Sequence, residues 1–193
     1  MKQKLLHKLN KRQGFSLTEM LATVLIMGFV GIIITTGAAT VQRVYRKVVA
    51  HANAQTALTT TITLMKDQFA FADPESIGNG SETGTGFGNS QTIVFRNLNS
   101  GEQTITLNPG TANRGFTLTY TAVDGTGTAS TTTLPLLSDS AITSDLCVCF
   151  DTNGGFTWDP ATQVITVTKL VAKDTRTDTV QARASFKVLL VNG

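Results

Sequence analysis

The residues with the clearest chemical potential are Gly14, Phe15 and Glu19. Glu19 is the only charged side chain between Phe15 and Gln42, in a segment that is otherwise almost wholly apolar. A carboxylate costs about 2.5–3.5 kcal/mol at the centre of a membrane helix, and less near its ends. Its most obvious partner is a free amine on Phe15, which would exist only if the chain were cut after Gly14. The spacing therefore predicts a cleavage site followed by a carboxylate with a functional role.

Two elements must position these residues: a basic leader over residues 1–14 and an apolar helix after it. The leader holds five of the sixteen basic residues and no acidic ones. The run from Leu21 to Ala39 carries no charge. It reaches the length of about 20 residues that spans a bilayer, whereas the apolar part of a secretory signal usually has only about 7–15. We expect a single membrane crossing, with the basic leader on the cytoplasmic side.

The boundary itself reads KRQG, ending at Gly14, and then FSLTEML, starting at Phe15. This pattern resembles the N-terminus of the type IV pilin and pseudopilin family, over roughly residues 1–45. The resemblance implies that a prepilin peptidase cuts after Gly14 and that the new terminal Phe15 is N-methylated. It also implies that Glu19 acts in filament assembly, by pairing with the N-terminus of a neighbouring subunit.

The resemblance further implies a structural subunit of a type IV pilus or a related filament. Its partners would be the membrane before assembly, the pilus assembly machinery, and identical or related pilin subunits in a helical polymer. It would lie in the cytoplasmic membrane at first and in an extracellular filament or at the cell surface after assembly. Two alternatives stay open. One is a pseudopilin of a type II secretion or competence (DNA-uptake) system, and the other is a membrane-anchored surface domain that never polymerises.

The chain departs from the family's pattern at three places. Its leader is longer than the short leaders of many members. The helix-breaking proline often found about 20 residues into the mature helix is absent, and Thr35-Thr36-Gly37 lies near that position. Many pilins close a C-terminal loop with two well-separated cysteines, whereas here the only cysteines are Cys147 and Cys149.

The charge balance argues against a nucleic acid as a direct high-affinity ligand. The whole chain has a formal net charge of +3. Without residues 1–14 it would carry eleven basic and thirteen acidic side chains, a formal net charge of −2. A basic surface of the kind that binds nucleic acid is therefore not indicated.

A single long helix is predicted from Phe15 to Phe71, because this stretch contains no proline and only three glycines. Residues 15–40 form its membrane-spanning or filament-core half. Residues 41–72 form an amphipathic half, whose apolar stripe from Val41 onward we expect to pack against a globular domain. Gly28, Gly31 and Gly37 either let neighbouring helices pack closely or let the helix bend.

The rest of the chain divides into a loop and a β domain. Residues 73–90 are rich in Gly and Ser and predict a flexible surface loop. Residues 91–193 form short β-branched or alternating runs separated by turn signals, which predict an antiparallel sheet. The expected strands are 92–95, 104–107, 116–120, 130–137, 146–150, 163–171 and 180–191. The predicted fold class is α+β, with the second half of the helix packed on this sheet, and the family resemblance implies the same architecture.

Residues of catalytic type are sparse, so no enzyme, cofactor or metal site is predicted. His51 is alone in the helix, and a lone helical histidine is far more often a surface or packing residue than a catalyst. The run from Asp151 to Gly155 lacks most calcium ligands, and a turn is the preferred interpretation. Cys147 and Cys149 share one face of a strand, about 6.6 Å apart at Cα, which is the far edge of disulfide geometry. Buried thiols are preferred to a strained or intermolecular bridge.

Overall fold

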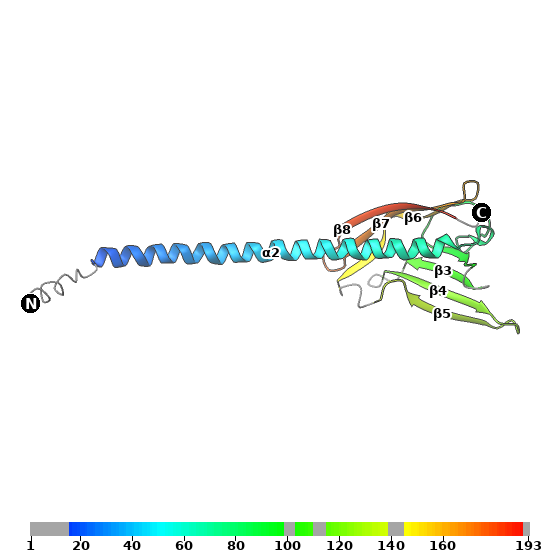
Figure 1. The fold of residues 1–193 in the computed structure, drawn as a ribbon, viewed down its shortest axis with the longest axis horizontal. Helices are drawn as coiled ribbons and strands as arrows, with labels where there is room; N and C mark the ends of the chain where they lie inside the picture. Colours follow the sequence, from blue (N-terminus) through cyan, green and yellow to red (C-terminus); the bar gives the residue numbers. More distant parts are fainter. Residues whose placement is uncertain (1–15, 99–102, 110–114, 139–144, 191–193) are drawn as a thin grey trace, which may run out of the picture. The chain divides into compact units, whose positions relative to one another are not determined.

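The computed structural model describes residues 16–98, 103–109, 115–138 and 145–190. The chain forms two compact units, Met1–Lys47 and Val48–Gly193. The leader over residues 1–14, including Gly14, and the adjoining Phe15 lie outside the described residues. Among those described are one long α-helix, one short 3-10 helix and eight strands (Figure 1).

Helix α2 runs from Leu17 to Ala70, a length of 54 residues, and confirms the long helix predicted from the sequence. At a rise of 1.5 Å per residue it is about 81 Å long. It ends shortly before Pro74, which cannot continue a helix because it lacks a backbone N–H. Asp73 instead caps the 3-10 helix η1 (Pro74–Ser76), accepting a hydrogen bond from the backbone N–H of Glu75.

The strands form two antiparallel sheets of four, not the single sheet expected from the sequence. One sheet has the order β1-β6-β7-β8 and the other the order β2-β3-β4-β5. The strands are β1 (Phe87–Ser90), β2 (Ile93–Arg96), β3 (Thr104–Pro109), β4 (Phe116–Val123), β5 (Ala129–Pro135), β6 (Leu146–Asp159), β7 (Val164–Asp174) and β8 (Thr179–Leu189). In Figure 1, β8 lies to one side of the last turns of α2, and β3, β4 and β5 lie to the other.

Residues 73–90, predicted as a flexible surface loop, include two short ordered elements. This segment contains η1 and β1, and Gly78 exchanges two backbone hydrogen bonds of 2.8 Å with Val94 in β2. A Cβ at Gly78 would lie 2.1 Å from the carbonyl oxygen of Glu82, so only glycine fits the fold-back there. The segment therefore covers the outer edge of β2, where it satisfies backbone groups that would otherwise face solvent.

The turn predicted from Asp151 to Gly155 is a bulge within β6. The strand advances five residues between Phe150 and Gly155, while its partner β7 advances two, from Leu170 to Thr168. The extra residues bend the strand without ending it, as β-bulges do. Turn-forming residues in the sequence are therefore compatible with one strand 14 residues long.

The core lies where α2 meets both sheets. Phe69 packs edge-on against Phe95 of β2 and Phe156 of β6, with ring centroids 5.4 and 5.9 Å apart. The sequence predicted that the apolar stripe of the helix packs from Val41 onward. The buried side of α2 begins only at Ala54, so the predicted start of packing is too early. Val41 and Tyr45 are each 68% exposed. The buried residues of α2 are Ala54, Ala57, Leu58, Thr61, Met65 and Phe69.

Candidate functional site: an apolar helix with one carboxylate

The site predicted from the sequence begins at the first turn of α2. The Ser16 carbonyl accepts hydrogen bonds from the backbone N–H groups of Glu19 and Met20, at 2.9 and 3.1 Å. The Ser16 hydroxyl contacts the Thr18 hydroxyl at 2.7 Å. These bonds define the helix start immediately after the predicted cleavage position.

Glu19 lies in this first turn and is exposed. A carboxylate in the first turn interacts favourably with the partial positive charge of the helix N-terminus. Within the described residues, no basic side chain pairs with it, and the next charged residue along the helix is Arg43. Gly14 and Phe15, the residues of the predicted cleavage and methylation, lie outside the described residues.

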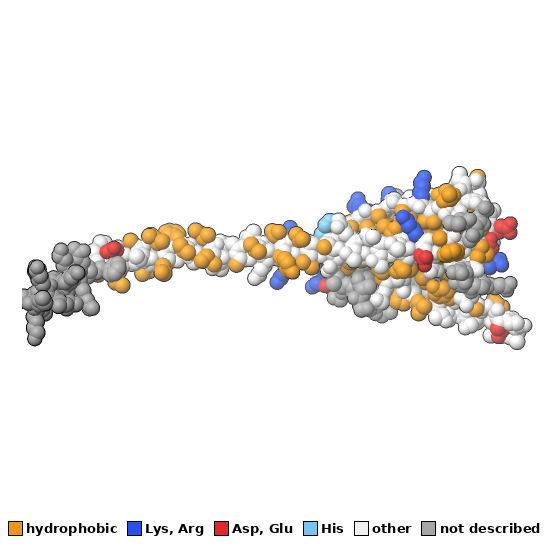
Figure 2. All heavy atoms as spheres, in the orientation of Figure 1, with side chains coloured by type: hydrophobic (Ala, Val, Ile, Leu, Met, Phe, Trp, Pro, Cys, Tyr) orange, Lys and Arg blue, Asp and Glu red, His pale blue; other side chains and the backbone are white. Residues whose placement is uncertain are grey.

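From Met20 to Ile34 the helix has apolar side chains at positions all round its axis, and all of them are exposed in the single chain. Figure 2 shows those on the face in view. By length and composition it can cross a membrane, and none of its most apolar stretch is buried. A surface helix of a soluble protein has one apolar stripe and a polar opposite face. This one does not. The exposed residues between the helix start and Ile34 include Leu17, Met20, Leu21, Val24, Leu25, Ile26, Met27, Phe29, Val30, Ile32 and Ile33.

The hydroxyl groups in this stretch are satisfied within the helix itself. Thr23, Thr35, Thr36 and Thr40 each donate to a backbone carbonyl three or four residues earlier, at 2.8–2.9 Å. Such bonds leave the methyl group outward and need no external partner. The helix surface is therefore compatible with an apolar surrounding in spite of its threonines.

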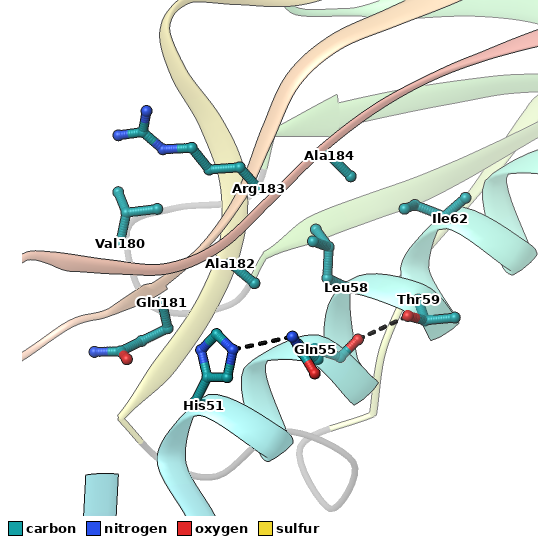
Figure 3. Close-up of a pocket in the computed structure, with 10 residues that line it drawn as sticks. All are labelled: His51, Gln55, Leu58, Thr59, Ile62, Val180, Gln181, Ala182, Arg183 and Ala184. Carbon is teal, nitrogen blue, oxygen red and sulfur yellow. Dashed lines mark hydrogen bonds between the residues drawn. The ribbon is translucent and has the colours of Figure 1, made fainter. Parts of the chain in front are cut away.

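A groove of about 590 Å³ lies between α2 and β8 in the second unit (Figure 3). On its helix side, the Nε2 atoms of His51 and Gln55 lie 3.0 Å apart, and the Thr59 hydroxyl donates to the Gln55 carbonyl at 2.8 Å. On its strand side it is lined by residues from Val180 to Ala184, including Arg183. None of the described residues that line it carries a carboxylate. No sequence pattern indicates this groove, because its two sides lie far apart in the chain.

Cys147 and Cys149 are both free thiols, and of the two thiols expected to be buried only Cys147 is. Cys147 is buried and Cys149 is half-buried. The Cys149 thiol hydrogen bonds to the Cys147 sulfur, and this bond lowers the pKa of Cys147 from 9.0 to about 6. The same bond raises the pKa of Cys149, since its proton is held between the two sulfurs.

No group of three or more His, Cys, Asp or Glu side chains in the described residues is arranged to hold a metal ion. Comparison of the chain with family models, with characterised proteins and with solved structures finds no match. The interpretation of the apolar helix therefore depends on its own sequence and geometry.

Proposed function

We propose that this chain is a structural subunit of a type IV pilus or a related filament. It enters the membrane as a precursor, is cut after Gly14, is N-methylated on Phe15, and polymerises through its apolar helix. The observation that supports this proposal most directly is that the first part of α2 exposes apolar side chains on every side and bears one carboxylate, in its first turn.

The apolar surface supports two successive environments. Burying a Leu, Ile or Phe side chain contributes about 1.5–3 kcal/mol relative to leaving it in water. A dozen such side chains cannot stay solvated, so the helix lies in lipid or against other helices. Lipid suits the precursor, and a bundle of identical helices suits the filament.

Glu19 supports assembly with a defined register. A buried charge left without its partner costs about 3–5 kcal/mol, whereas a paired one is roughly neutral compared with apolar packing. In a bundle of apolar helices, the Glu19 carboxylate therefore favours the axial position that places it beside a neighbour's Phe15 amine. Other offsets leave both charges unpaired. The pair contributes specificity more than stability.

Under this proposal, residues 1–14 are removed by the peptidase, and the second unit is a domain that lies outside the membrane. The main rival is an anchored surface domain that never polymerises. This alternative explains the apolar helix equally well, but it assigns no role to Glu19.

The test is the mass of the mature N-terminal peptide, taken from protein isolated from its native cell envelope. A chain that starts at Phe15 and is heavier by one methyl group supports the proposal and excludes the anchored rival. An intact Met1, or a cut beyond Ala39, contradicts it.

A further inference from the structure

The second unit holds a chemical group that filament assembly does not use, the thiol pair of β6. Val148 and Phe150 face the core. Cys147 and Cys149 alternate with them along the strand and therefore point to the opposite face of the sheet. Cys147 is 4% exposed yet lies outside the core cluster. The two sulfurs hydrogen bond to each other, and the backbone N–H of Gly115 donates to Cys147. The thiols are therefore held side by side on the outer face of the sheet.

The distance between the two cysteines determines whether a disulfide or a metal ion can link their sulfurs. Residues i and i+2 of a strand lie about 6.6 Å apart with nearly parallel Cβ vectors. A disulfide needs Cβ atoms only about 3.5–4.5 Å apart, so closing one here requires the backbone to distort. Two thiolates on one metal ion place their sulfurs about 4.6 Å apart, twice a metal–sulfur bond of about 2.3 Å. The geometry suits a bridging ion better than a covalent bond.

The surroundings suit an anionic complex. Lys173 lies directly across from Cys147 on β7, in the same register position. Its ammonium group forms an ion pair with Asp178, and its positive charge favours the thiolate form of each cysteine. At Cys149 this effect opposes the hydrogen bond to Cys147, burial and the nearby Asp151 carboxylate, which together raise the pKa of Cys149. A monovalent ion held by two thiolates has a net charge of −1, which this ammonium group partly offsets.

An approach from solvent lies beside the half-buried member of the pair. The cross-strand partner of Cys149 is Val171, which pairs in turn with Arg183. Val171 and Arg183 line a hollow of about 390 Å³, together with Asp151, Lys169, Ala184 and Ser185. An ion can therefore reach Cys149 first and then engage the buried Cys147.

We propose that Cys147 and Cys149 form a two-coordinate site for a soft monovalent metal ion, Cu(I) in the first place. Thiolates favour Cu(I), zinc and iron–sulfur clusters. Zinc and iron–sulfur centres take four protein or solvent ligands. In the described part of the chain no third His, Cys, Asp or Glu completes such a set. Cu(I) needs only the two sulfurs. This site is independent of the proposed filament function and of Glu19.

The test is a titration of the purified, reduced full-length chain in detergent with Cu(I), without oxygen and in competition with a coloured Cu(I) chelator. The expected result is one Cu(I) per chain, with X-ray absorption showing two sulfur neighbours. Cys149→Ala is expected to weaken binding by more than about 100-fold, because even the loss of an outer-shell partner costs about 10–100-fold. Cys149 is half-buried, so this variant is chosen over one at Cys147 to preserve the fold.

The matched control is Met27→Leu, which removes an exposed thioether of the apolar helix and is expected to leave Cu(I) binding unchanged. Three results would overturn the proposal. The first is one Cu(I) per chain retained in Cys149→Ala, and the second is loss of binding in Met27→Leu. The third is one Cu(I) for every two chains, which places the ion between copies. None of these depends on whether filaments form.

Discussion

The ring of Phe69, near the end of α2, meets the ring of Phe156 in β6 edge-on, with centroids 5.9 Å apart and planes at 85°. Phe69 also meets Phe95 of the other sheet, so one helix side chain joins both sheets. Edge-to-face pairs add about 0.5–1.5 kcal/mol beyond the burial of their surface. The attachment of the helix to the β domain therefore depends strongly on this residue.

We expect Phe69→Ala to lower the free energy of unfolding of the second unit by about 3–5 kcal/mol, through lost burial and the cavity left behind. Denaturation can be followed by the fluorescence of Trp158, the only tryptophan in the chain, which is 2% exposed. Phe71→Ala is the control, since Phe71 is 41% exposed and its removal is expected to change stability little. Equal losses from the two variants would contradict the bridging role.

Gly155 is required because β1 passes close to it. A Cβ there would lie 2.6 Å from the carbonyl oxygen of Ser90, a backbone atom that cannot move away alone. We expect Gly155→Ala to destabilise the second unit by about 1–3 kcal/mol, as overpacking does. In Gly88→Ala the added Cβ meets nothing within 4 Å, and stability should hold or rise slightly. The measurement is thermal unfolding of the two variants under the same conditions. Equal stability of Gly155→Ala and Gly88→Ala would contradict the close approach of β1 to Gly155.

Gly14→Leu tests the processing step. If a peptidase requires a small residue before the cut, the variant should accumulate in the membrane as an uncut precursor carrying residues 1–14. The measurement is the intact mass of the chain from membranes of cells that express it. Normal removal of the leader from this variant would show that Gly14 does not define the site.

Glu19→Val separates processing from assembly. The variant should be cut and methylated normally, since the cleavage position is unchanged, but its incorporation into filaments should fall steeply, because the register-selecting charge is gone. The measurement is the ratio of chain in sheared filaments to chain in membranes. Asp67→Asn is the control, because it removes an exposed carboxylate from the same helix beyond the apolar part. Filament yields equal to wild type in Glu19→Val would remove the proposed role.

The thiol pair gives a defined dependence of stability on pH. The Cys149 hydrogen bond lowers the pKa of Cys147 from 9.0 to about 6, so the folded chain loses one proton near pH 6 and the unfolded chain does not. Stability therefore rises between about pH 6 and 9. Above pH 9 the unfolded chain loses both thiol protons while the raised pKa of Cys149 retains one in the folded chain, and stability falls again.

This dependence is checked by denaturation at a series of pH values, with the thiolate absorbance of the folded chain measured in parallel. Cys149→Ala removes the donor, so the pKa of Cys147 should rise towards its ordinary value. Cys149→Ser keeps a hydroxyl donor and should show a smaller rise. A titration of Cys147 that does not change in Cys149→Ala would show that the hydrogen bond is not the cause.

The sequence alone determined the features that depend on neighbouring residues. The absence of proline and the apolar composition from Phe15 onward predicted α2, and the single charge at Glu19 marked the candidate site. Alternation of side chains placed most of the strands and put Cys147 and Cys149 on one face. These features follow from local backbone geometry, in which helix and strand periods are set within a few residues.

Only the tertiary structure decided which distant residues meet. It divided the strands between two sheets, started the buried side of α2 at Ala54, and turned residues 151–155 into a bulge rather than a turn. It also placed Lys173 opposite Cys147. Strand partners and packing contacts are chosen by the burial of surface across the whole unit, and one sequence pattern permits several pairings. Local patterns therefore predicted the elements, while the shared core fixed their arrangement.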